Sequence, residues 1–122
     1  MKKKILVVDD EPSIVRLLTM RLKAKNYEVF AAYDGLEGIK TAEKEIPDLI
    51  IMDVKMPKED GIGAFEKLIQ LDITSKIPVI FMTASHPIIE IENQVLKMGA
   101  KSCIAKPFIS EDLEQALAMA FA

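Results

Sequence analysis

Five short apolar runs recur along the chain, and each is followed by a longer segment in which apolar residues return every three or four positions. The runs cover residues 5–8, 27–32, 49–52, 78–82 and 102–105. Runs of this length are typical of strands buried on both faces of a sheet. The strand-then-helix order, repeated five times, predicts an α/β fold with right-handed crossovers and a parallel sheet covered by helices on both sides.

The segments between the runs carry the start and stop signals of helices. The expected starts are Pro12, Asp34, Asp60, Pro87 and Ser110, and the expected ends include Asn26 and Gly99. Proline suits a first helical turn, Asp and Ser suit an N-cap, and Asn and Gly suit a C-terminal end. The apolar residues expected on inner helix faces are Ile14, Leu17, Leu18, Leu22, Leu36, Ile39, Ala42, Ile62, Phe65, Leu68, Ile69, Ile88, Ile91, Val95, Met98, Leu113, Ala116, Leu117, Ala120 and Phe121.

Length and composition narrow the class of protein. A chain of 122 residues predicts one domain over 1–122, large enough to bury a core. The net charge of -3 does not favour direct binding to nucleic acid. One cysteine excludes an internal disulfide and fits a reducing, cytoplasmic compartment. No apolar stretch approaches about 20 residues, so no membrane insertion is expected.

Polar residues stand where four of the five runs end. Asp9 and Asp10 follow the first run, and Asp53 ends the third. Thr83 follows the fourth run, and Lys106 the fifth. Because parallel strands end at one edge of a sheet, and ligands in such sheets bind outside the carboxyl ends, these side chains are expected to form one site.

Three converging carboxylates repel one another unless a cation lies among them. Oxygen ligands of this kind suit Mg²⁺, with Mn²⁺ as a second possibility. A hydroxyl and an ammonium complete a set that fits phosphoryl transfer, in which catalysis is mostly positioning and charge neutralisation. A carboxylate can itself be the nucleophile, so Asp53 is the candidate acceptor of a phosphoryl group.

The motifs at these positions resemble the receiver domain of two-component response regulators. They are VVDDEP at 7–12, DLIIMDVKMP at 48–57, DG at 60–61, MTAS at 82–85, MGA at 98–100 and AKPF at 105–108. The resemblance covers essentially the whole chain. It implies a flavodoxin-like (βα)5 three-layer sandwich, with strand order 2-1-3-4-5.

The resemblance also implies a role for each site residue. Asp53 would take a phosphoryl group from a phosphohistidine of a histidine kinase or a histidine phosphotransfer protein. Asp10 and Asp53 would bind Mg²⁺ directly, together with the backbone carbonyl of Lys55, while Asp9 would act through a bound water. At rest Lys106 would pair with Asp53, and after phosphorylation it would pair with the phosphoryl group.

The switch of the family has a second part, in which the chain departs from the pattern. Thr83 would hydrogen-bond a phosphoryl oxygen and shift toward it. Family members usually carry Tyr or Phe three residues before the lysine, and that ring swings inward when the threonine moves. Cys103 occupies this position and has no ring. It is interpreted as a small buried hydrophobe, with a redox switch as the lesser alternative.

A partner surface is expected on the fourth helix. Ile89 and Leu96 are seven residues apart and fall beside the expected core stripe, so they would mark a face for a downstream target unless a wide stripe buries them. In the family, the fourth helix, fifth strand and fifth helix also support a homodimer. No output domain follows the last helix in this sequence, which fits either a stand-alone receiver or one domain of a larger protein.

Three other functions compete with the phosphoacceptor reading. An aspartate-nucleophile phosphatase needs a second acid two residues after the first, where this chain has Lys55. A flavin nucleotide module needs a phosphate cradle, whereas the first loop here, residues 9–12, is acidic. A receiver-like interaction protein that is never phosphorylated would not need all five site residues.

Overall fold

The computed structural model describes residues 2–56, 58–84, 88–106 and 110–121, with the backbone alone for Ile88 and Ser110. Its single sheet is parallel, in the order β2-β1-β3-β4-β5. The strands are β1 (Lys4–Val8), β2 (Glu28–Ala32), β3 (Leu49–Asp53), β4 (Val79–Thr83) and β5 (Ser102–Ala105). The predicted flavodoxin-like fold and strand order are therefore confirmed.

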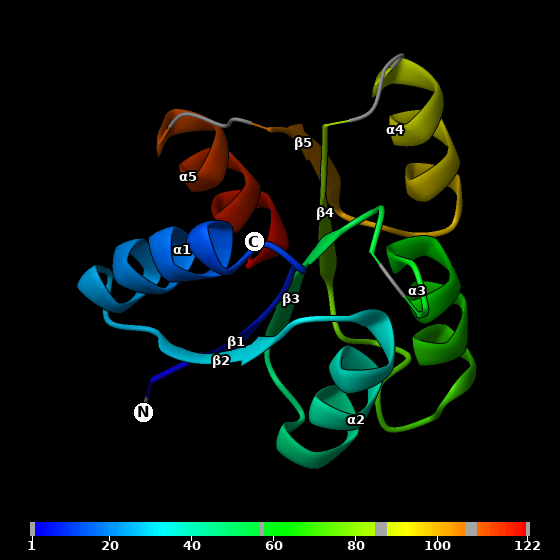
Figure 1. Cartoon of the computed structure of the whole chain (residues 1–122), viewed down its shortest axis with the longest axis horizontal. Coiled ribbons are helices and arrows are strands. Elements are labelled where there is room, and N and C mark those ends of the chain that lie inside the picture. The colour runs from blue at the N-terminus through cyan, green and yellow to red at the C-terminus, as the bar shows by residue number, and fades with distance from the viewer. Residues whose placement is uncertain (1, 57, 85–87, 107–109, 122) are drawn as a thin grey trace.

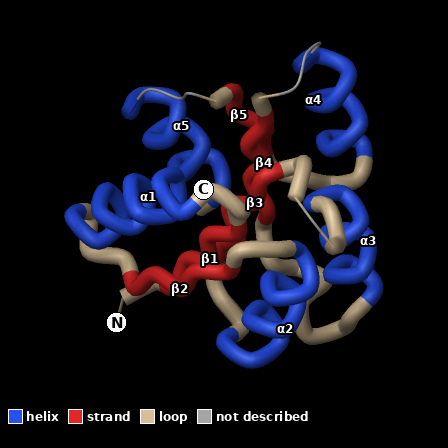
Figure 2. The backbone as a smooth tube through the Cα atoms, in the orientation of Figure 1, coloured by secondary structure: helices blue, strands red, loops and turns tan. Residues whose placement is uncertain are grey.

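Five helices cover the two faces of this sheet, which makes three layers (Figures 1 and 2). They are α1 (Pro12–Ala24), α2 (Gly35–Glu45), α3 (Gly61–Gln70), α4 (Ile88–Lys97) and α5 (Ser110–Ala120). Helices α1 and α5 pack on one face, and α2, α3 and α4 pack on the other (Figure 1). In the described part of the chain, no helix is long and apolar enough to cross a membrane.

The centre of the sheet supplies most of the core. All five residues of β3 are buried, because the strand lies between β1 and β4 and has helices on both faces. Its side chains alternate between two apolar clusters, with Leu49 and Ile51 facing α1 and α5, and Ile50 and Met52 facing α2, α3 and α4. Strand β3 therefore places Asp53 at the edge of the core, where the residue is 6% exposed.

Three of the predicted inner helix positions are wrong. Leu17 is 39% exposed, Leu36 is 43% exposed and Ile69 is 39% exposed. Each sits at the flank of an apolar stripe, and in α1 the buried position is taken by Val15 instead. Hydrophobic periodicity does not specify how much of a helix surface the neighbouring sheet buries. In this fold the sheet buries only a narrow strip of each helix, and these three residues lie outside it.

The helix ends follow the predicted chemistry. Asp34 and Asp60 cap α2 and α3 by accepting hydrogen bonds from backbone N–H groups three residues on. Asn26 and Gly99, beyond the ends of α1 and α4, have positive φ angles of 76° and 110°. The start of α4 at Pro87 and the cap expected from the Ser110 side chain lie outside the described atoms.

Candidate functional site

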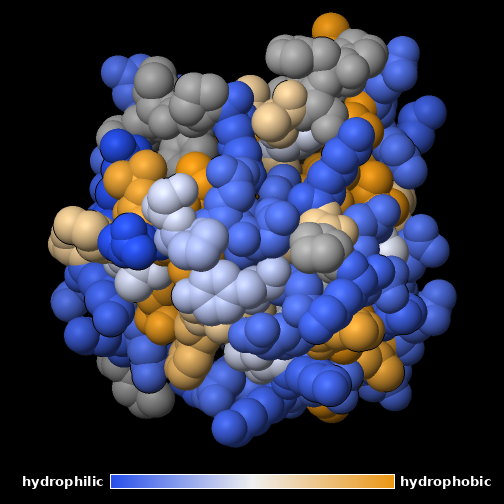
Figure 3. Space-filling view, viewed as in Figure 1, coloured by the Kyte–Doolittle hydropathy of each residue, from blue (hydrophilic) through white to orange (hydrophobic). Residues whose placement is uncertain are grey.

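The carboxyl edge of the sheet brings the predicted side chains together. Asp53 and Thr83 are the last residues of β3 and β4, and Lys106 directly follows β5. A cleft of about 540 Å³ opens there, lined by Asp10, Glu11, Asp53, Lys55, Thr83, Ala84 and Lys106. Hydrophilic residues cover the middle of the molecular face in Figure 3. Of the motifs that point to this site, Pro57, Ser85, Pro107 and Phe108 lie outside the described residues.

Gly61 packs closely against the backbone at the end of β3. Its N–H donates to the carbonyl of Val54 over 2.7 Å, which closes the loop after β3 onto the first turn of α3. A Cβ at Gly61 would lie 2.1 Å from the carbonyl oxygen of Asp53. Only glycine permits this approach, so the Asp60–Gly61 pair both starts α3 and fixes the backbone of Asp53.

Lys106 is the positive centre of the site. Its ammonium donates hydrogen bonds to Asp53 Oδ2 at 3.0 Å and to Glu11 Oε1 at 3.2 Å. It also lies 2.8 Å from Asp9 Oδ2, as an ion pair without hydrogen-bond geometry. The lysine side chain is 8% exposed, and Asp9 is fully buried. One buried cation thus links the ends of β1, β3 and β5.

Burial dominates the electrostatics of these groups. It raises the pKa of Asp53 above its ordinary 3.8, and the ammonium of Lys106 offsets only part of that effect. The pKa of Asp9 is raised for the same reason. For Lys106, burial alone would lower the pKa, but contact with Asp9 and Asp53 outweighs burial and raises it above 10.5. The site therefore holds a permanent cation beside carboxylates that are costly to ionise.

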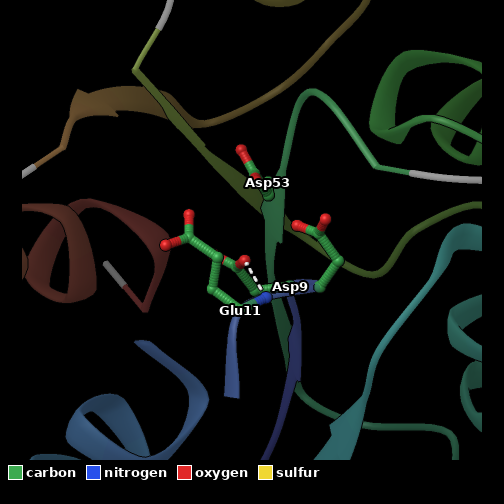
Figure 4. Close-up of side chains that lie close together, drawn as sticks. Asp9, Glu11 and Asp53 are labelled. Carbon is green, nitrogen blue, oxygen red and sulfur yellow. Dashed lines mark hydrogen bonds between the residues drawn. The ribbon is translucent and has the colours of Figure 1, made fainter. Parts of the chain in front are cut away.

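The fourth carboxylate, that of Glu11, was not predicted. Its backbone N–H donates to Asp9 Oδ1 over 2.9 Å (Figure 4). Its side chain accepts a hydrogen bond from Lys106. The sequence signal was present, because Glu11 follows the two aspartates in the same VVDDEP motif.

The donor set fits a divalent cation. Asp9, Asp10, Glu11 and Asp53 each offer a carboxylate oxygen, and these oxygens all lie within 4.8 Å of one another. These four acids outnumber the one lysine, Lys106, and leave excess negative charge in a partly buried cleft. Hard oxygen ligands at such a site suit Mg²⁺ or Mn²⁺ rather than a softer metal.

Cys103 lies within β5 and is 7% exposed. Burial, with a smaller effect of the Glu92 charge, raises the pKa of its thiol to about 11. A thiol with that pKa is almost wholly protonated at neutral pH and reacts slowly, because the thiolate is the reactive form. This environment fits the interpretation of Cys103 as a small buried hydrophobe.

The predicted surface on α4 is exposed. Ile89 is 65% exposed and Leu96 is 41% exposed, whereas Val95 is fully buried. The alternative of a wide buried stripe is therefore wrong. Met119 of α5 is 58% exposed as well. In Figure 3, hydrophobic residues gather at the right of the viewed face, over the region of α3 and α4.

Known proteins resemble this chain in sequence and in structure. Residues 5–118 match the family described as response regulator receiver domain. The alkaline phosphatase synthesis transcriptional regulatory protein PhoP of Bacillus subtilis is 45% identical over 109 residues, which cover 88% of this chain and 44% of that protein. The chain thus spans about half the length of the curated relatives it matches.

Two solved structures have the same fold. The chemotaxis response regulator CheY4 of Vibrio cholerae superposes with a TM-score of 0.89 at 30% identity, covering 98% of this chain and 99% of that one. CheY of Borrelia burgdorferi, in a complex with CheX, BeF₃ and Mg²⁺, superposes with a TM-score of 0.91 at 26% identity, covering 98% and 90%.

Proposed function

Since the chain belongs to the family of response regulator receiver domains, we propose that it receives a phosphoryl group on Asp53. The donor is a phosphohistidine of a histidine kinase or of a histidine phosphotransfer protein. The observation that carries the proposal is the setting of Asp53, which ends the buried strand β3 and accepts a hydrogen bond from the buried ammonium of Lys106. A carboxylate so placed is fixed and faces an open cleft.

The transfer needs a nucleophile and groups that hold negative charge. A carboxylate oxygen of Asp53 attacks phosphorus, the P–N bond to the donor breaks, and its electron pair leaves with the imidazole. Lys106 and the hydroxyl of Thr83 face the same cleft and donate to the oxygens of the transferred group. Donors fixed at the edge of the cleft stabilise the charge that develops on the transferred group.

A divalent cation completes the site. Asp10 and Asp53 would bind Mg²⁺ directly with the carbonyl of Lys55, and Asp9 would bind through a water, with Mn²⁺ as an alternative metal. When bound, the ion neutralises the carboxylates and the incoming phosphoryl oxygens. The cluster of acidic oxygens within 4.8 Å supports this assignment. The chain's own chemistry is then limited to gain and loss of its phosphoryl group.

Phosphorylation would be read through a change in partner binding. The exposed apolar residues Ile89, Leu96 and Met119 support a contact face formed by α4, β5 and α5, for a downstream target, an output domain or a second copy of the chain. PhoP of Bacillus subtilis is a transcriptional regulatory protein, so transcriptional output is the first possibility to test. Cys103 has no aromatic ring, so an aromatic side chain at this position cannot couple Thr83 to this face.

The test is phosphorylation by acetyl phosphate with Mg²⁺, followed by intact mass. We expect one phosphoryl adduct on the wild type, none without Mg²⁺ and none in Asp53→Asn. Asp72→Asn, an exposed aspartate between α3 and β4, is the matched control and keeps the adduct. An adduct that survives in Asp53→Asn would contradict the proposal. Rapid multiple turnover without an adduct would instead favour the phosphatase.

A further inference from the structure

Glu11 precedes α1 but does not serve that helix as a cap. It occupies the N-cap position with an extended backbone, and its side chain makes no capping hydrogen bond. Ser, Thr, Asp or Asn at this position usually accepts a bond from the first turn, which stabilises the helix by about 1 kcal/mol. The Glu11 carboxylate instead reaches the ammonium of Lys106, 95 residues away in the chain.

The ammonium of Lys106 is already engaged by three carboxylates in this state, through two hydrogen bonds and one further ion pair. It carries three N–H groups. Three carboxylates stand within reach: Asp9 at 2.8 Å, Asp53 at 3.0 Å and Glu11 at 3.2 Å. A phosphoryl group added to Asp53 brings oxygens that compete with the present partners for the same ammonium.

Burial decides which partner gives way. Asp9 is fully buried and also accepts a hydrogen bond from the Glu11 N–H, so its carboxylate cannot move into bulk solvent. Asp53 carries the phosphoryl group. The Glu11 side chain is 57% exposed, so its carboxylate is readily solvated when it leaves Lys106. Glu11 is the exchangeable member of the three.

We propose that Glu11 is a positioning residue that holds Lys106 in the unphosphorylated state and competes with the phosphoryl group for it. The inference rests on the proposed function, because it concerns the same acceptor. The contact between Glu11 and Lys106 therefore stabilises the unphosphorylated state. Loss of this contact favours the phosphorylated state.

A different role for the same carboxylate makes an opposite prediction. The oxygens of Glu11 also lie among those that could hold a cation. As a metal ligand, Glu11 would strengthen Mg²⁺ binding, and its neutralisation would weaken every Mg²⁺-dependent state. As a competitor for Lys106, its neutralisation strengthens the phosphorylated state while the metal remains bound.

The experiment measures binding of fluoroberyllate, a phosphoryl analogue, at saturating Mg²⁺ by ¹⁹F NMR of the full chain. For Glu11→Gln we expect binding about two- to tenfold tighter than wild type. Glu11→Asp keeps the charge but shortens the arm, and it is expected to follow the Gln variant. The control is Glu114→Gln: Glu114 is also 57% exposed and also pairs with a lysine, Lys25, which follows the C-terminal end of α1. It should bind like the wild type.

A second measurement reports the contact itself. The ¹⁵Nζ resonance of Lys106, assigned by its loss in Lys106→Met, should shift in Glu11→Gln and stay in place in Glu114→Gln. Direct Mg²⁺ titration by calorimetry completes the set. If Glu11→Gln binds the analogue no more tightly than wild type, or loses tenfold or more in Mg²⁺ affinity, the inference is overturned. If wild type itself does not bind the analogue, the proposed function fails instead.

Discussion

The ammonium of Lys106 lies 3.0 Å from Asp53 Oδ2, although 53 residues separate the two in the chain. Both side chains are 8% exposed, so the pair is shielded from solvent. A buried cation and a buried anion stabilise each other only when both are present. Lys106 therefore matters for the stability of this edge of the sheet as well as for the chemistry of the site.

Replacement of Lys106 by an uncharged residue should lower the free energy of unfolding. Lys106→Met leaves Asp9 and Asp53 without a positive partner, and we expect it to cost about 3–5 kcal/mol in the free energy of unfolding. Lys25→Met, which breaks an exposed ion pair with Glu114, should cost less than about 1 kcal/mol. Urea unfolding at pH 7 without Mg²⁺ measures both. Equal costs would show that Lys106 is not a structural cation.

Removal of the acceptor charge should have the opposite effect on stability. Burial raises the pKa of Asp53 above 3.8, so the folded state binds this proton more tightly than the unfolded chain does. Ionisation of Asp53 therefore lowers stability as pH rises through that raised value, and no such loss occurs below the unfolded pKa.

Asp53→Asn removes this loss, because an amide does not ionise. Without Mg²⁺, the variant should unfold at higher urea concentration than wild type at pH 7, and the difference should shrink as pH falls toward 3.8. Unfolding curves at several pH values check this, with Asp72→Asn as a control that shows no such trend. A variant less stable than wild type at pH 7 would mean that the contact with Lys106 outweighs burial.

A methyl group at Gly61 should disturb the acceptor. Gly61→Ala places a Cβ 2.1 Å from the backbone oxygen of Asp53, which must move to make room. We expect a loss of about 2–4 kcal/mol in stability, together with slower phosphorylation by acetyl phosphate.

Gly63→Ala, in the same helix, is the matched control. Its Cβ would meet the end of the Glu59 side chain, which can swing away, and would lie 3.3 Å from Asp60 Oδ1, where a shift of a few tenths of an ångström is enough. Its stability should stay within about 1 kcal/mol of wild type, because Ala also favours a helix. Similar losses in the two variants would point to a general effect on α3 rather than to the approach to Asp53.

The apolar face of α4 should contribute to partner binding and not to folding. Ile89→Ala and Leu96→Ala should each change stability by less than about 0.5 kcal/mol, while Val95→Ala, in the core, should cost about 1–3 kcal/mol. Thermal unfolding distinguishes these cases. The double Ile89→Ala, Leu96→Ala variant should also weaken self-association or target binding of the phosphorylated chain, as measured by light scattering. A large drop in its melting temperature would refute the surface role.

Most of the fold could be predicted from the chain. The runs at 49–52 and 102–105 indicated strands, because a short apolar run bounded by polar residues is typical of a buried strand. Asp34, Asp60 and Gly99 marked helix ends because capping depends on local backbone geometry. The inner faces were less certain, as Leu17 and Leu36 show, since burial depends on the width of the neighbouring layer.

What the sequence by itself determined is the set of groups at the strand ends: Asp9 and Asp10, Asp53, Thr83 and Lys106. Parallel strands must end together, so local pattern was enough to bring these groups to one edge. Only the tertiary structure decided that Lys106 contacts three carboxylates, that Asp9 is the most deeply buried of them, and that Glu11 is the third. Those facts depend on distances between β1, α1 and β5, which no short stretch of the chain encodes.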